Sequence, residues 1–94
     1  MVIDNYKERN QNGTRLIYKK GQVILHNGNI YVCVKKTEKS PTKEPKSWIN
    51  TGFIEPYYGV TEPVKPIENQ LWIKNEDSIF VWKKDFKKYS WIKV

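Results

Sequence analysis

The stretch that decides the fold reads Val23-Ile-Leu25, His26-Asn-Gly-Asn29, Ile30-Tyr-Val-Cys-Val34. Two short runs of β-branched and aromatic residues flank an Asn-Gly pair, and this pair favours the positive backbone dihedrals of a tight turn. The sequence therefore predicts a β-hairpin over residues 23–34. The single cysteine, Cys33, falls within the second run, so we expect a small core side chain and not a reactive thiol.

A similar pattern returns towards the C-terminus. Leu71-Trp-Ile73 and Ile79-Phe-Val-Trp82 are separated by a polar turn at 74–78, and a basic turn at 83–88 leads to a third run at 89–94. This spacing predicts a three-stranded meander. Alternation along the middle run places Phe80 and Trp82 on one face and Ile79 and Val81 on the other.

Changes in composition divide the chain into four segments. Residues 1–17 are polar without a clear period and predict an N-terminal arm, and residues 18–53 hold the first hairpin unit. Residues 54–68 contain three prolines and predict an extended Pro-rich connector in which neither a helix nor a central strand fits. Residues 69–94 form the C-terminal β-meander. The two halves are also compatible with one compact domain.

The composition supports an all-β fold. Alanine is absent and leucine and methionine total four, whereas β-branched residues are abundant and aromatic residues make up 14% of the 94-residue chain. We expect small antiparallel hairpin units arranged as a short sandwich or a partly open barrel, with a core rich in aromatic rings. Most of the four tryptophans are expected to serve that core.

The residues available for chemistry argue against an enzyme. The chain has one histidine, His26, beside the predicted turn, and no second histidine or cysteine at metal-ligand spacing. The acidic residues lie mostly in turns and in the connector, and the five glycines are isolated. We therefore expect no catalytic residues, no metal and no cofactor.

The net charge is +7, from 17 basic and 10 acidic residues, and only Arg9 and Arg15 are arginines. Lysine suits diffuse attraction to anions, whereas planar recognition of phosphate or of bases usually requires arginine. Nucleic acid is therefore not the expected partner. The lysines gather in residues 1–47 and in the last twelve residues.

Exposed rings and nearby lysines are the candidate binding residues. Tyr57 and Tyr58 are neighbours in the connector, so their rings cannot both face one core, and at least one of them is expected to be exposed or to contact another chain. The candidate binding or interface residues are Tyr57, Tyr58, Trp48, Trp72, Trp82, Lys35, Lys36, Lys83 and Lys84.

Two groups of residues carry a resemblance to known modules. Tyr18-Lys-Lys-Gly21-Gln-Val23, then Asn27-Gly28-Asn-Ile-Tyr31-Val-Cys-Val, then Pro41 or Pro45 and Trp48, resemble the layout of small carbohydrate-binding modules of the chitin-binding family 5/12 type. The second half, with Pro63-Val-Lys-Pro66, Leu71-Trp72-Ile, Phe80-Val-Trp82 and Trp91, is similar to the ending of many bacteriophage tail, fibre and baseplate accessory proteins.

The resemblance implies a non-enzymatic bacteriophage virion component attached to the tail, baseplate, fibre or capsid. Such a module would be made in the host cytoplasm without a signal peptide, would have no membrane contact, and would dock on other virion proteins in several symmetric copies. One alternative is a glycan-binding adhesin for a host cell-wall polysaccharide. Another is a five-stranded β-barrel that binds single-stranded nucleic acid.

Overall fold

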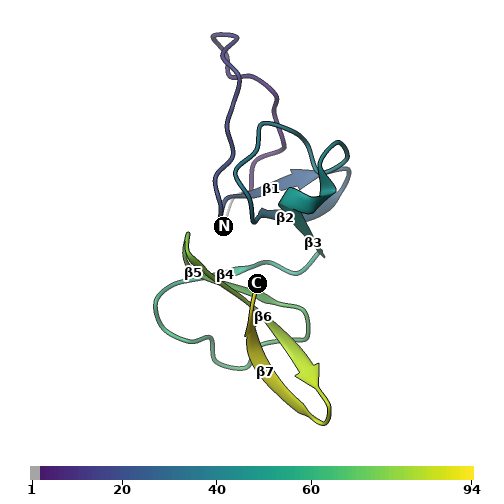
Figure 1. Ribbon diagram of the computed structural model, residues 1–94, viewed down its shortest axis with the longest axis vertical. Coiled ribbons are helices and arrows are strands. Elements are labelled where there is room, and N and C mark those ends of the chain that lie inside the picture. The colour runs from purple at the N-terminus through teal and green to yellow at the C-terminus, as the bar shows by residue number, and fades with distance from the viewer. Residues whose placement is uncertain (1–2) are drawn as a thin grey trace.

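Seven strands form two separate sheets in the computed structural model, which describes residues 3–94. The all-β expectation is confirmed, and among these residues there is no α-helix and no closed barrel. The molecule measures 48 × 24 × 21 Å, with the first sheet in its upper half and the second in its lower half (Figure 1). The strands are β1 (Val23–His26), β2 (Asn29–Cys33), β3 (Trp48–Gly52), β4 (Tyr57–Tyr58), β5 (Leu71–Asn75), β6 (Ser78–Asp85) and β7 (Lys88–Lys93).

The first sheet has the strand order β1-β2-β3 and contains the predicted hairpin. Asn27 and Gly28 form its turn with φ values of 51° and 81°, the left-handed conformation that an Asn-Gly pair tolerates at low cost. A short 3-10 helix, η1 (Pro45–Ser47), leads directly into β3, whose first residue is Trp48. The predicted hairpin is therefore confirmed, and Trp48 begins the strand that completes this sheet.

The second sheet has the strand order β4-β5-β6-β7, and its last three strands are the predicted meander. Both turns predicted in the meander, at 74–78 and at 83–88, are shorter in the structure. β5 continues to Asn75 and β6 runs from Ser78 to Asp85, so only residues 76–77 and 86–87 form turns. The predicted connector also contains a strand, β4, which pairs in parallel with β5 at the edge of the sheet. Proline has no backbone N–H to donate, so a strand in a Pro-rich segment is expected at the edge of a sheet and not at its centre.

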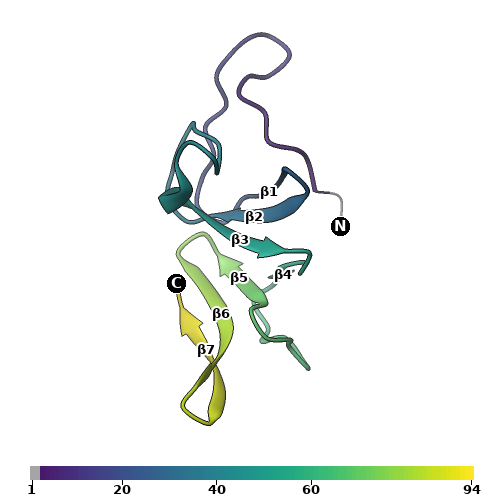
Figure 2. The same cartoon turned by 90° about the vertical axis from the view of Figure 1, so that its right-hand side faces the viewer.

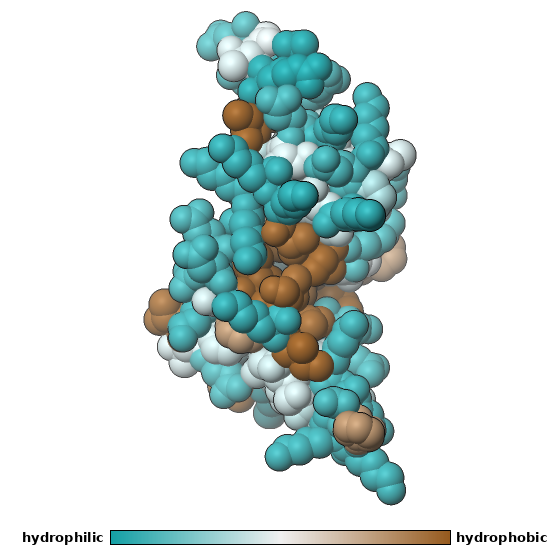
Figure 3. All heavy atoms as spheres, viewed as in Figure 1, coloured by the Kyte–Doolittle hydropathy of each residue, from teal (hydrophilic) through white to brown (hydrophobic). Residues whose placement is uncertain are grey.

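The two sheets share one buried cluster, which we call the inter-sheet core. It joins Val32 of β2 to Leu71, Ile73 and Ile79 of the second sheet, and none of these side chains is more than 4% exposed. Figure 3 shows apolar side chains gathered at the middle of the molecule, where the sheets meet. The two halves of the chain are thus held together by apolar burial.

The opposite face of the first sheet is covered by the N-terminal arm. Tyr18, Ile24, Cys33 and Trp48 form a second buried cluster, the arm-side core, with Tyr6 and Leu16 of the arm packed against it. The expected burial of Cys33 is confirmed, since its side chain is fully buried.

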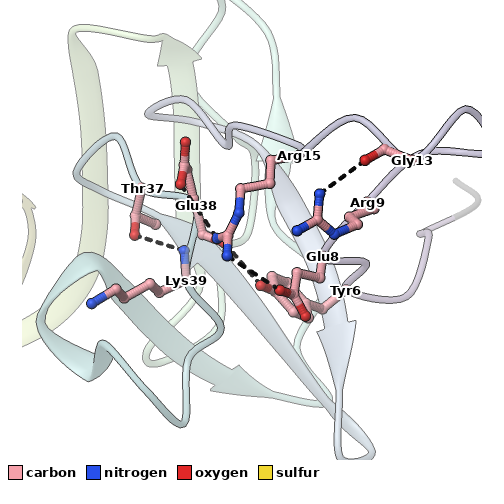
Figure 4. A network of polar contacts seen from close by, with 8 residues as sticks. All are labelled: Tyr6, Glu8, Arg9, Gly13, Arg15, Thr37, Glu38 and Lys39. Atoms are coloured by element: carbon pink, nitrogen blue, oxygen red, sulfur yellow. Dashed lines mark hydrogen bonds and ion pairs between the residues drawn. The ribbon is translucent and has the colours of Figure 1, made fainter.

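Polar contacts fix the arm to the loop that follows β2 (Figure 4). The Arg15 guanidinium forms ion pairs with the carboxylates of Glu8 (N···O 3.6 Å) and Glu38 (N···O 3.5 Å). The Tyr6 hydroxyl donates a hydrogen bond to the backbone carbonyl of Glu38 at 2.9 Å. The far end of the arm is closed by a hydrogen bond from Arg9 to the Gly13 carbonyl. Both faces of the first sheet are therefore covered by the chain itself.

Candidate functional site

The outer face of the second sheet, which points away from the inter-sheet core, collects most of the aromatic rings of the C-terminal half. Neighbouring residues of a strand point to opposite faces and directly paired residues share a face, so the register places Phe80 beside Trp72 and Trp82 beside Trp91. We call this surface the aromatic face. Its rings are Tyr57, Trp72, Phe80, Trp82, Tyr89 and Trp91.

Five of these rings form a continuous row across the sheet. The centroids are 5.1 Å apart from Phe80 to Trp72, 5.5 Å from Trp72 to Trp91 and 5.0 Å from Trp91 to Trp82. Tyr89 then stacks on Trp82 at 6.0 Å, with only 11° between the ring planes. These spacings lie in the range at which aromatic rings attract one another, so the row is held in a fixed arrangement.

Lysine ammonium groups lie over two rings of this row. Lys74 Nζ is 6.0 Å from the centroid of the Trp72 ring, and Lys84 Nζ is 5.8 Å from that of Tyr89. The negative face of an aromatic ring attracts a cation at this distance. The aromatic face therefore combines apolar rings with positive charge at its margin.

Exposure varies along the aromatic face. Trp72 is only 9% exposed, and its indole N–H donates to the Gly59 carbonyl at 2.8 Å, so this ring acts as the floor of the row. Tyr57 and Tyr89 are 37% and 41% exposed, and Phe80, Trp82 and Trp91 are half-buried. Cross-strand rings stabilise the sheet on which they stand, but this face, unlike both faces of the first sheet, stays open to solvent.

The structure brings together four of the nine candidate residues from the sequence and separates the other five. Tyr57, Trp72, Trp82 and Lys84 lie on the aromatic face. Tyr58 and Lys83 occupy alternate positions of the same strands and point to the opposite face of the sheet. The three remaining candidates belong to the first half, with Trp48 buried in the arm-side core and Lys35 and Lys36 exposed in the loop after β2.

Four members of this surface were not among the sequence candidates, namely Lys74, Phe80, Tyr89 and Trp91. Alternation in β6 already placed Phe80 beside Trp82. Tyr89 and Trp91 could have been found from the register of the meander, because a two-residue turn at Phe86 and Lys87 sets Trp91 opposite Trp82 and Tyr89 opposite Lys84. Lys74 could have been found from alternation along β5, which places it on the same face as Trp72.

Two hollows lie outside the aromatic face. The larger, about 770 Å³, lies between the arm, β1 and Tyr58 and is lined by both polar and apolar residues. The smaller, about 330 Å³, opens at the seam between the sheets beside Ile49, Leu71 and Val81. Within residues 3–94, no group of three or more histidine, cysteine, aspartate or glutamate side chains is placed to hold a metal ion. No helix in this range is long and apolar enough to cross a membrane.

The chain matches no protein-family model, and neither a curated protein nor a solved structure is significantly similar to it.

Tyr58 ties the second sheet to the first, and this contact predicts a dependence on alkaline pH. Its hydroxyl donates to the Gly21 carbonyl at 3.1 Å, and burial raises the pKa of this phenol above its usual value. Because the folded pKa is raised, the neutral phenol contributes stability below the unfolded pKa of about 10, and this contribution is lost as the pH rises through the folded pKa.

We expect Tyr58→Phe to lower the free energy of unfolding by about 1 kcal/mol at pH 7 and to make stability fall less steeply above pH 10. Urea unfolding at pH 7 and across the alkaline range measures both effects. Tyr57→Phe is the matched control, because it removes a neighbouring hydroxyl that does not reach Gly21. An equal loss in the two variants would contradict the role of the Tyr58 bond.

Proposed function

We propose that this chain is a non-enzymatic structural module of a bacteriophage virion, and that it docks on a neighbouring protein subunit through the aromatic face. The observation that carries the proposal is the asymmetry of the two sheets. The arm and the second sheet pack against the two faces of the first sheet, whereas no other part of the described chain packs over the row of rings on the second sheet, in which Tyr89 is exposed and Phe80, Trp82 and Trp91 are half-buried. The particle context is supported by the resemblance of the second half to tail, fibre and baseplate accessory proteins.

The geometry suits docking for a physical reason. Rings locked against one another lose little conformational freedom on binding, and aromatic side chains at the centre of an interface contribute much of the binding energy. Tyr57 and Tyr89 are the exposed anchors and Trp82 is a half-buried one, and Trp91 and Tyr89 hold the Trp82 ring from two sides. The surrounding lysines favour a neighbour whose rim is acidic, because complementary charge increases the rate of encounter and selects the partner.

Most soluble oligomers are symmetric assemblies of identical chains, so we propose several symmetric copies of the chain on each particle. In this arrangement each copy presents its aromatic face to an equivalent neighbouring subunit. The arm and the first sheet then point away from the contact.

Quantitative peptide mass spectrometry of purified particles tests this proposal. The particles are those of the phage or prophage that encodes the chain, purified by density gradient and washed in high salt. We expect the chain at a fixed ratio to the major structural proteins. Its absence from washed particles, while it remains abundant in the lysate, would overturn the proposal.

One observation favours a second candidate, a glycan-binding adhesin for a host cell-wall polysaccharide. The stacked rings of Trp82 and Tyr89 are partly exposed, and sugars bind proteins by stacking their apolar faces on such rings. Sedimentation with purified cell walls separates the candidates. Binding that persists at 1 M salt supports ring stacking on a glycan, and binding that disappears indicates charge attraction alone.

A further inference from the structure

The hairpin of β6 and β7 extends beyond the body of the molecule. Every residue from 83 to 90 is exposed, and Figures 1 and 2 show this hairpin at one end of the long axis, opposite the tip of the arm. We call residues 83–90 the basic ribbon. The pair Trp82 and Trp91 stands at its base, and Tyr89, the last ring of the row, lies within it.

Four lysines and one acidic residue lie in the basic ribbon. The register places Lys83 and Lys88 on one face together with Asp85, which stands opposite Lys88, and Lys84 on the other face over the Tyr89 ring, with Lys87 in the turn. Both ion pairs found in residues 3–94 belong to Arg15, so no ribbon lysine is neutralised by a salt bridge there. The ribbon therefore carries unpaired positive charge on two faces and at its tip.

Phe86 lies in the turn at the tip of the ribbon and has a backbone conformation that is unfavourable for phenylalanine. Its φ is 58°, in the left-handed region that glycine or asparagine adopts at lower cost, and its side chain is 95% exposed. The phenyl ring is therefore unfavourable for the turn and gains no burial within the chain. Both costs are explained if the ring contacts something outside the molecule.

We propose that the basic ribbon enters a groove of double-stranded DNA, with its lysines on the phosphates and Phe86 against the base pairs at the groove floor. A two-stranded ribbon fits the major groove, and each groove is bordered by two phosphate backbones, which matches lysines on both faces of the ribbon. An apolar side chain at the tip of such an element can contact thymine methyl groups at the floor of the major groove.

The contact is sequence-independent, because lysines act as point charges on phosphates and the ribbon has no arginine to read base edges. The row of rings gives the ribbon a stiff base. This inference goes beyond the docking proposal, because it rests on Lys83, Lys87, Lys88 and Phe86, none of which lies on the aromatic face, and either one stands if the other fails.

Fluorescence anisotropy with a labelled duplex of about 20 base pairs, at several salt concentrations, tests the inference on the full chain. Four phosphate contacts predict a slope of log affinity against log salt of about −4. The variant Lys83→Gln/Lys87→Gln/Lys88→Gln is expected to bring the slope to about −1 and to weaken binding at least about tenfold at low salt.

The matched control is Lys39→Gln/Lys43→Gln/Lys46→Gln, which removes the same charge from exposed positions before β3. We expect it to keep the wild-type slope. Phe86→Gly relieves the strained turn, so it should preserve or raise the melting temperature while lowering duplex affinity roughly tenfold.

Four results would overturn the inference. They are an absence of duplex binding, an equal change of slope in the control triple variant, equal affinity for a single-stranded oligonucleotide of the same length, and equal affinity for poly-glutamate. The last two would show that the ribbon attracts any polyanion without entering a groove.

Discussion

Leu71→Ala is expected to lower the free energy of unfolding by about 2–5 kcal/mol, which is a large part of the stability of a domain of this length. Leu71 is fully buried in the inter-sheet core, where it packs with Val32 of the first sheet. Removing the isopropyl part of its side chain leaves a cavity at the point where the two sheets meet. For a domain of this size the melting temperature should fall by about 8–40 °C.

Thermal unfolding followed by far-ultraviolet and near-ultraviolet circular dichroism measures this effect. Val64→Ala is the control, because Val64 is 85% exposed and its truncation should change stability by less than about 0.5 kcal/mol. We expect both signals to move together in Leu71→Ala, as one cooperative transition. A loss in one sheet only, or a loss below about 1 kcal/mol, would contradict a core shared by the two sheets.

Tyr57→Ala/Tyr89→Ala is expected to remove most of the chain from purified particles. The two rings are the most exposed on the aromatic face, and truncating central aromatic anchors typically weakens an interface by about 2 kcal/mol or more, which is roughly thirtyfold. Neither side chain is part of the inter-sheet core, so folding should survive. The copy number per particle, measured by mass spectrometry in a strain that supplies only the variant, gives the effect.

Phe53→Ala is the control for this variant. Phe53 is 87% exposed and follows β3 in the first half of the chain, so its truncation removes an exposed ring away from the aromatic face. We expect it to enter particles at the wild-type level. Normal entry of the double variant, or exclusion of Phe53→Ala, would place the docking surface elsewhere.

Local sequence patterns were sufficient for the elements that depend on neighbouring residues. The Asn27-Gly28 pair predicted the first hairpin because its turn chemistry has few alternatives, and the same reasoning gave the meander of the second half. Alternation along β6 correctly divided Phe80 and Trp82 from the buried aliphatic residues.

Features that depend on distant contacts were not accessible from these patterns. The strand at Tyr57 and Tyr58 exists because it pairs with β5, and nothing within the Pro-rich segment itself encodes that partner. The run of lysines from 83 to 88 suggested a longer turn, yet exposed ribbon strands accept polar residues and the pairing continues to Asp85. Tertiary context likewise decided that Trp48 is buried while Trp82 remains partly open.

Hydroxyl-radical footprinting of the chain, free and within purified particles, tests docking through the aromatic face most directly. We expect the oxidation of Tyr57, Trp82 and Tyr89 to fall on assembly, because the aromatic face becomes covered. Oxidation of Phe53, which is 87% exposed and lies away from that face, should stay unchanged. Unaltered oxidation of the three anchors in particles that contain the chain would contradict docking through the aromatic face.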